Sequence, residues 1–378
     1  NTTSNACTVT LPASPEVGDQ IVLADYARTW ATNAVTLDSN GNNFQGEADT
    51  YTVDYDTVGQ SLNIVYADST KGWLPVSDDA VADVGVAPAT QKGLFAFGYT
   101  GSLTSVKNLV NSSGVVASDV TGVGTARYGL AASSYGGDKA IFAYGYASGY
   151  VSMSNLVNNS GVVAADVSGV GSARSGLGSS SYGGDKAIFG FGSTGSYVSL
   201  TNLVNNSGVV GADVSGVGTA RFGIAATEYG EDKGIFGFGF TAAENLTGVT
   251  NLISNSGVVA SDVSAVGTAR RYASAAPYGG DKGIFAYGNT SGGGNVSMSN
   301  LVSNSGVVAS DVSGVGTARE GSNATNYGGD KAIFGFGNSG SVTGVTNLVN
   351  NSGVIAADVS AVGTARSDPA AAGYSYSA

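Results

Sequence analysis

The chain has no histidine and a single cysteine, Cys7, among its 378 residues. These absences exclude a disulfide within the chain, zinc sites built from cysteine and histidine, and acid–base catalysis by histidine. Residues 38–43, DSNGNN, place oxygen ligands at alternate positions, but they lack the distal glutamate of a calcium loop and contain an Asn-Gly turn signal. We therefore expect no metal site and no cofactor.

Charge and long apolar runs are also scarce. Charged residues make up 12% of the chain, the net charge is −12, and no run of 18 apolar residues occurs. Because phosphate binding needs clustered lysine and arginine, and a membrane span needs such a run, we expect neither a nucleic-acid partner nor membrane insertion. The segment NTTSNACTVT begins without Met and lacks the regions of a signal peptide, so we expect a processed or partial chain.

Glycine is abundant, with 59 residues, and it accompanies an internal repeat. The repeat is marked by the arginine of a GTAR or GSAR motif, and successive markers are 47, 47, 49, 49 and 47 residues apart. A period near 50 residues with short β-rich segments is typical of a propeller or a β-solenoid. The marker arginines are Arg127, Arg174, Arg221, Arg270, Arg319 and Arg366.

Composition divides the chain into three parts. Residues 1–80 contain short alternating apolar runs between turn clusters, which predict a small, sandwich-like β domain suited to assembly. Residues 81–91 have the composition of a linker. Residues 92–378 carry the repeats, and each repeat offers four strand-like segments, for example 139–145, 152–158, 161–167 and 173–182.

The second strand of each repeat carries two aromatic residues two positions apart, such as Phe142 and Tyr144. Period two predicts that both rings lie on one face of a sheet, where they would pack against the next sheet. The segment after each arginine consists of alanine, serine and glycine, as expected for strands crowded around an axis.

The two ends of the repeat region complement one another. The first repeat begins at its second strand, and the last one ends in an inner strand, 366–378. Both termini can thus complete one sheet, which would remove free sheet edges. We predict an all-β fold with a six-bladed, kelch-like propeller closed by both termini, since a solenoid would need caps at its terminal repeats.

Two resemblances support this interpretation. Arginine, small residues, a Gly-Gly turn and a strand such as KAIFAYG resemble the first half of a kelch repeat. The phrases GDQIVLADYARTWATNAVTLDSNGNNFQG and GGDKAIFGFG…NLVNNSGVVAADVSGVGTAR resemble those of structural proteins of tailed bacteriophages from aquatic habitats. That resemblance implies a fibre or another virion-surface protein.

Several repeated charged residues are interpreted as structural. The Asp-Lys pairs on glycine-rich turns, such as Asp138 and Lys139, order the turn and begin a strand. An aspartate also stands eight residues before each marker arginine, and we expect ion pairs between blades or arginine bonds to loop carbonyls. These aspartates are Asp119, Asp166, Asp213, Asp262, Asp311 and Asp358.

The repeats differ mainly in the loop between their second and third strands and in the residue after the arginine. In an up-and-down blade both lie at the same end, so one face is free to diversify, and binding residues commonly lie on such loops. Drift in unconstrained loops is the alternative. The candidate ligand-binding residues are Tyr99, Tyr128, Tyr146, Tyr150, Tyr197, Phe222, Phe240, Arg271 and Glu320.

We expect a non-enzymatic structural and attachment protein of the phage tail-fibre type, on a virion surface or otherwise extracellular, without catalytic residues. Its variable face would bind a host-surface glycan or a neighbouring subunit, and its N-terminal domain would form a homo-oligomer, either a trimer or an open polymer. One alternative is a secreted prokaryotic protein that polymerises into an extracellular filament. Another is a glycan hydrolase on a propeller, for which the off-pattern acids are Glu228, Glu231, Glu244 and Glu320.

Overall fold

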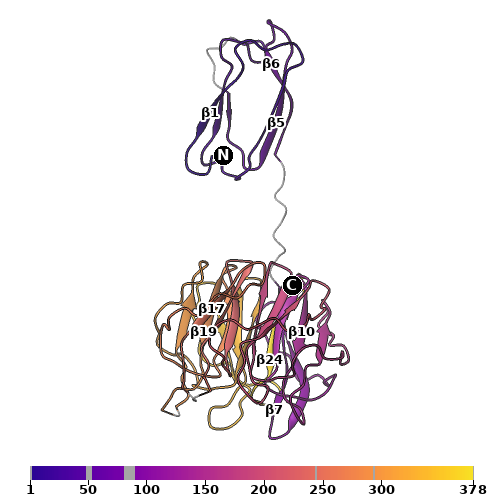
Figure 1. Cartoon of the computed structure of the whole chain (residues 1–378), viewed down its shortest axis with the longest axis vertical. Helices are drawn as coiled ribbons and strands as arrows, with labels where there is room; N and C mark the ends of the chain where they lie inside the picture. The colour runs from indigo at the N-terminus through magenta and orange to yellow at the C-terminus, as the bar shows by residue number, and fades with distance from the viewer. Residues whose placement is uncertain (1, 48–52, 81–89, 243–244, 293, 378) are drawn as a thin grey trace. The chain divides into compact units, whose positions relative to one another are not determined.

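A computed structural model describes residues 2–47, 53–80, 90–242, 245–292 and 294–377. The chain divides into two compact units, Asn1–Gly85 and Val86–Ala378 (Figure 1). The described residues form 24 strands and no helix, so the predicted all-β class is confirmed. Within these ranges no helix is long and apolar enough to cross a membrane. Residues 81–89 of the expected linker lie outside the described residues.

The N-terminal unit contains two three-stranded sheets. The first consists of β1 (Cys7–Thr10), β3 (Val35–Asp38) and β4 (Val53–Tyr55), and the second of β2 (Gln20–Ala24), β5 (Gln60–Tyr66) and β6 (Trp73–Ala80). Alternate residues of β5, including Leu62 and Ile64, are fully buried. They share one core with Val35 and Leu37 of the first sheet. Period-two burial therefore builds one core between two short sheets.

The second unit contains six antiparallel, three-stranded sheets, which we number in chain order. Sheet 1 consists of β24 (Ala370–Tyr374), β7 (Lys92–Tyr99) and β8 (Leu103–Val110), and sheet 2 consists of β9 (Ala131–Tyr135), β10 (Lys139–Ala143) and β11 (Ser154–Val157). Sheet 3 consists of β12 (Gly178–Tyr182), β13 (Lys186–Gly190) and β14 (Thr201–Val204), and sheet 4 consists of β15 (Ala225–Tyr229), β16 (Lys233–Gly237) and β17 (Thr250–Ile253). Sheet 5 consists of β18 (Ser274–Tyr278), β19 (Lys282–Ala286) and β20 (Ser299–Val302), and sheet 6 consists of β21 (Asn323–Tyr327), β22 (Lys331–Gly335) and β23 (Thr346–Val349).

The first strands of these sheets contact one another in succession. Strand β9 contacts β12, and the contacts continue through β15, β18 and β21 to β24, which also contacts β9. Strand β24, at the C-terminus, pairs with β7 at the start of the unit and lies beside β10 (Figure 1). The six sheets thus form a closed cycle of contacts, and sheet 1 is built from both ends of the unit.

The fourth strand expected in each repeat is not a regular strand. In sheet 2 the segment 161–167 pairs with β11 only through isolated bridges, Val157 with Val163 and Ser154 with Val167. Four residue steps on the outer segment therefore oppose three on β11, which is the signature of a bulge. The side chain of Asn155 occupies this bulge and donates hydrogen bonds to Ala164 at 3.0 Å and to Asp166 at 2.9 Å.

The prediction that both aromatic rings of a repeat share one face is wrong. Phe142 packs against Phe97 of sheet 1 with ring centroids 5.5 Å apart, whereas Tyr144 packs at the same distance against Phe189 of sheet 3. The cause is the backbone, because β10 ends at Ala143 and Tyr144 has φ 65°. A left-handed residue interrupts the alternation of side chains, so each repeat sends one ring to each neighbouring sheet.

The marker arginines join neighbouring sheets. Arg174 is fully buried, its Nε donates to the carbonyl of Phe191 in its own sheet at 2.9 Å, and its Cζ lies 4.1 Å from the ring centroid of Tyr144 in the preceding sheet. The series returns to its start, since Arg366 of sheet 1 lies over Phe336 of sheet 6. Burial lowers the pKa of Arg270 to about 10, so this guanidinium remains charged at neutral pH.

The repeated aspartates act within a sheet. Asp166 accepts hydrogen bonds from the amide of Thr125 at 3.0 Å and from its hydroxyl at 2.6 Å, and the Nη1 of Arg127 lies 3.8 Å from it. Burial acts to raise the pKa of Asp166, but the hydrogen bonds from Thr125 and Asn155 lower it on balance. Each aspartate thus ties the segment before the inner strand to the outer segment of the same sheet, and the arginine supplies the link to the next sheet.

Candidate functional site

The residue after each marker arginine pairs with the first residue of a variable loop. Tyr128, for example, forms an antiparallel bridge with Tyr146. The other five pairs are Ser175 with Ser193, Phe222 with Phe240, Arg271 with Asn289, Glu320 with Asn338, and Ser367 with Tyr99. The two positions that vary most between repeats therefore meet at one end of every sheet.

One position further along the chain, the backbones of all six repeats are hydrogen-bonded in a closed ring, which we call the backbone ring. The amide of each member donates to the carbonyl of the member in the preceding sheet, from 2.7 Å for Asp368 with Gly321 to 3.4 Å for Gly129 with Asp368. The members are Gly129, Gly176, Gly223, Tyr272, Gly321 and Asp368. All six have positive φ, between 50° and 62°.

Glycine suits the backbone ring for two reasons. It adopts positive φ without a steric cost, and it leaves room for side chains of the next sheet. A Cβ added to Gly176 would lie 2.2 Å from the ring of Phe222, and one added to Gly321 would lie 2.7 Å from Oδ1 of Asp368. Tyr272 and Asp368 are the two ring members with side chains, and both hold a left-handed conformation at φ 50°.

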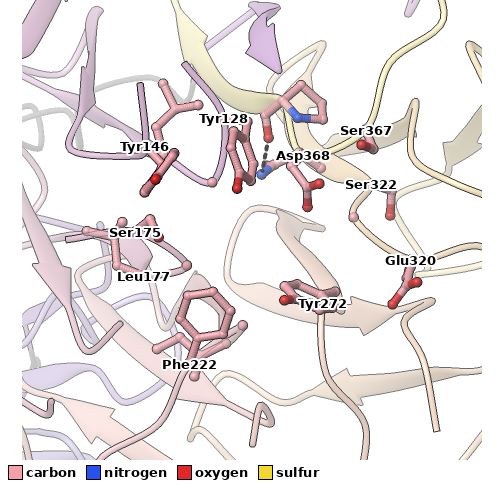
Figure 2. A pocket seen from close by; sticks show the side chains of 18 of the residues that line it. Tyr128, Tyr146, Ser175, Leu177, Phe222, Tyr272, Glu320, Ser322, Ser367 and Asp368 are labelled. Carbon is pink, nitrogen blue, oxygen red and sulfur yellow. Dashed lines mark hydrogen bonds between the residues drawn. The ribbon is translucent and has the colours of Figure 1, made fainter. Parts of the chain in front are cut away.

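A cavity of about 530 Å³ lies against the backbone ring. Five of the candidate residues line it, namely Tyr128, Tyr146, Tyr150, Phe222 and Glu320. Figure 2 shows the rings of Tyr128, Phe222 and Tyr272 and the carboxyl group of Asp368 around this space. Residues from all six repeats contribute to its wall, so the divergent positions converge on one recess.

The other four candidate residues contact this wall. Tyr99 packs against Tyr128 with ring centroids 6.0 Å apart. Tyr197 stacks on Phe222 at 5.7 Å and 13°, and Phe240 packs edge-on against Phe222 at 5.3 Å. The guanidinium of Arg271 lies 5.4 Å from the ring centroid of Tyr272. All nine candidates therefore belong to one cluster.

Two carboxyl groups give the cavity its electrostatic character. Burial raises the pKa of Asp368 to about 6; a hydrogen bond from Ser367 opposes this rise and the charge of Glu320 adds to it. Burial also raises the pKa of Glu320, which Arg271 partly offsets. Oε2 of Glu320 is buried without a hydrogen-bond partner among the described residues. The recess thus combines aromatic faces with two carboxyl groups, and it suits a ligand with an apolar face and polar donors.

Sequence reasoning missed Tyr272 and Asp368. It considered the residue directly after each arginine, whereas these two lie one position later. A signal was present, because glycine follows in four repeats and these two repeats depart from it. The consequence of that departure depends on φ and on the backbone ring, which the repeat pattern does not reveal.

The remaining off-pattern acids lie elsewhere. Glu228, on β15, accepts a hydrogen bond from Ser181, and burial raises its pKa to about 7. Glu231 is exposed on the turn that follows β15, and Glu244 lies outside the described residues. No group of three or more potential metal-ligating histidine, cysteine, aspartate or glutamate residues occurs in the part of the chain that the structure describes.

Neither known protein families nor curated protein sequences provide a match for this chain. What the protein does must therefore be argued from its fold and from this cavity.

Proposed function

We propose that sheets 1–6 are the blades of a six-bladed β-propeller and that the cavity at its variable end is the binding site of an attachment protein. The cycle of sheet contacts and the pairing of β24 with β7 support the propeller. In this proposal the rigid repeats hold the recess, and the ligand is a glycan on a host surface. The resemblance to phage structural proteins favours a virion-surface setting.

The observation that carries the proposal is the convergence of divergent residues. The residue after each arginine and the variable loops differ between repeats, yet their aromatic side chains form one cluster around one cavity. Repeat geometry places these positions together whatever residues they carry, so it is their chemistry that supports a binding role: seven of the nine candidates are aromatic, which drift in unconstrained loops does not favour. Aromatic rings beside carboxyl and amide groups are the lining that binds the apolar face and the hydroxyls of a sugar ring.

The N-terminal unit is proposed to assemble copies of the chain. Val22 on β2 is 64% exposed and Val76 on β6 is 65% exposed, and these two strands are the edges of one sheet. Tyr26, just after β2, is 87% exposed. Exposed apolar side chains along sheet edges favour pairing with another copy, as a trimer or an open polymer.

Binding can be tested by incubating the full chain with immobilised host polysaccharides and measuring retention. Tyr128→Ala and Phe222→Ala should each reduce retention at least tenfold, because each removes a ring from the cavity wall. Tyr376→Ala, which changes an exposed aromatic residue of the repeat unit outside the cavity, is the matched control. Full retention by both cavity variants would contradict the proposal.

The assembly role is tested by measuring the native mass of the full chain and of its Val22→Glu variant. We expect the full chain to form an oligomer and the variant to lose it.

A glycan hydrolase is the second candidate, because two carboxyl groups with raised pKa share the cavity. Pairs of carboxyl groups in one site are the acid and base of most glycosidases. Release of reducing ends from bound polysaccharide, lost in Glu320→Gln and in Asp368→Asn, would favour this activity. Retention without release would favour attachment alone.

A further inference from the structure

Two departures from glycine in the backbone ring point to a specific ligand. Four repeats use glycine, whereas Tyr272 and Asp368 hold φ at 50°, where side chains are strained. A non-glycine residue in this region carries backbone strain and commonly marks a functional site. Both residues line the cavity, Tyr272 with a ring and Asp368 with a carboxyl group (Figure 2).

Glu320 stands between these two residues in the order of the repeats. It belongs to sheet 6, Tyr272 to sheet 5 and Asp368 to sheet 1, so three adjacent repeats supply two acids and one ring. Burial raises the pKa of Asp368 and the charge of Glu320 adds to this rise, so the two carboxyl groups act on one another across the recess. The charged group that acts on this pair is Arg271, whose Cζ lies 5.4 Å from the ring centroid of Tyr272 and whose charge acts on Glu320. The titratable tyrosines that interact with Asp368 are Tyr128 and Tyr272.

We infer that the cavity takes an amino sugar whose protonated amine lies between Glu320 and Asp368 and whose ring packs on Tyr272 and Phe222. This inference rests on the proposed glycan-binding function and names its ligand class. An ammonium group supplies both a positive charge and three donors, which suits a wall that carries the carboxyl groups of Glu320 and Asp368. An aromatic face also attracts a cation, so the rings and the acids favour the same group.

The opposite side of the cavity accommodates the rest of the sugar. Tyr128 and Tyr146 pack against one another with ring centroids 5.7 Å apart, and Ser175 and Leu177 lie between them and Phe222 along the wall. A volume of about 530 Å³ is within the range of small-ligand sites.

The test is calorimetric titration of the full chain with glucosamine, N-acetylglucosamine, glucose and choline at pH 7. Glucosamine should bind at least tenfold more tightly than the two uncharged sugars and than choline. Asp368→Gly and Glu320→Gln should each weaken glucosamine binding at least tenfold. Asp368→Gly restores the residue found in four other repeats, so loss of binding in this variant does not reflect misfolding. Glu231→Gln, an exposed acid outside the cavity, should leave the affinity unchanged.

The pH profile adds a second criterion. Affinity for glucosamine should rise as Asp368 ionises above pH 6 and fall again as the amine loses its proton near pH 8. Equal affinity for glucosamine and glucose, or for glucosamine and choline, would overturn the amino-sugar inference. If glucosamine and glucose bind with equal affinity, the glycan-binding proposal would stand. Absence of binding to all three sugars would overturn the amino-sugar inference, and full retention of the Tyr128→Ala variant on host polysaccharide would overturn the glycan-binding proposal as well.

Discussion

The carboxylate of Asp119 accepts hydrogen bonds from the amide of Thr364 at 3.0 Å and from its hydroxyl at 2.5 Å, although 245 residues separate the two. The same interaction joins Asp213 to Ser172 within a continuous part of the chain, with distances of 3.1 and 2.6 Å. Sheet 1 is therefore tied as the internal sheets are, and the two ends of the repeat unit hold each other in place.

Removal of this carboxylate tests the closure. We expect Asp119→Ala to lower the free energy of unfolding by about 1–3 kcal/mol, because the buried side-chain amide of Asn108 and the exposed amide and hydroxyl of Thr364 lose an acceptor. Asp213→Ala should cost a similar amount, and urea unfolding followed by circular dichroism measures both. A much smaller effect for Asp119→Ala would mean that the ends fray and that the cycle is open in solution.

Replacement of a marker arginine should be far more costly than replacement of an exposed lysine. Arg270 is fully buried, donates to Tyr287 at 2.9 Å and to Asn300 at 2.6 Å, and lies 4.0 Å from the ring centroid of Phe238. A lysine keeps the charge but not the planar fork, so we expect Arg270→Lys to cost about 3–5 kcal/mol. Lys282→Met, which removes an exposed ion pair, should leave the free energy of unfolding nearly unchanged in the same experiment.

Glu228 should make the repeat unit less stable as the pH rises. Burial raises its pKa to about 7; the hydrogen bond from Ser181 opposes this rise and the charges of Asp232 and Glu231 add to it. Because the pKa of Glu228 is higher in the folded chain than in the unfolded chain, folding favours the protonated form. Stability therefore falls as the pH rises from about 4.5 to about 7. The free energy of unfolding of Glu228→Gln should equal that of the wild type at pH 4 and exceed it by about 2 kcal/mol at pH 8.

The exposed neighbour Glu231 is the control for this pH dependence. Glu231→Gln should follow the wild-type stability curve from pH 4 to pH 8, apart from a small change due to its charge. A pH-independent gap between Glu228→Gln and the wild type would show that Glu228 does not change its protonation on folding.

Asp25 should give the N-terminal unit the opposite pH dependence. Burial acts to raise the pKa of this carboxyl, but hydrogen bonds from the amides of Gly59, Thr29 and Trp30 outweigh it and lower the pKa. The stabilisation that the Asp25 carboxylate gives the N-terminal unit is therefore complete above the ordinary aspartate pKa and is lost as the pH falls below it. Asp25→Ala should destabilise the unit by about 1–3 kcal/mol at pH 7 and by less at pH 3.

Tryptophan fluorescence reports on this unit alone, because Trp30 and Trp73 are the two tryptophans of the chain and both lie in its core. An Asp25→Ala effect of equal size at both pH values would show that the carboxylate acts through packing and not through its charge.

Asp368→Gly should stabilise the protein while it weakens ligand binding. The change removes a strained φ of 50° and a carboxyl group whose pKa is raised to about 6 by burial. We expect a gain of about 1–3 kcal/mol at pH 8, measured by thermal unfolding, and a smaller gain at pH 4, where the carboxyl is protonated in the fold. Gly176→Ala is the reverse change and should destabilise, since its Cβ would meet the ring of Phe222. A loss of stability in Asp368→Gly would contradict the strain argument.

The sequence predicted several features of the site because they depend on neighbouring residues. The positions after the marker arginines could be identified as variable, and the loops could be assigned to the same end of each sheet. All nine candidate residues belong to the cluster around the cavity. The direction of Tyr144 could not be predicted, because alternation along a strand holds only until a residue adopts a left-handed φ.

The sequence by itself determined the repeat, the order of the strands in each sheet and the completion of sheet 1 by both ends, since strand pairing within a repeat follows from local pattern and turns. Only the tertiary structure decided that Tyr272, Glu320 and Asp368 share one cavity. Their separation along the chain is set by the repeat length, but their proximity arises only when six sheets pack in a cycle and the backbone ring brings their strands together. The cost of replacing glycine there likewise depends on neighbours from other repeats, which no local pattern contains.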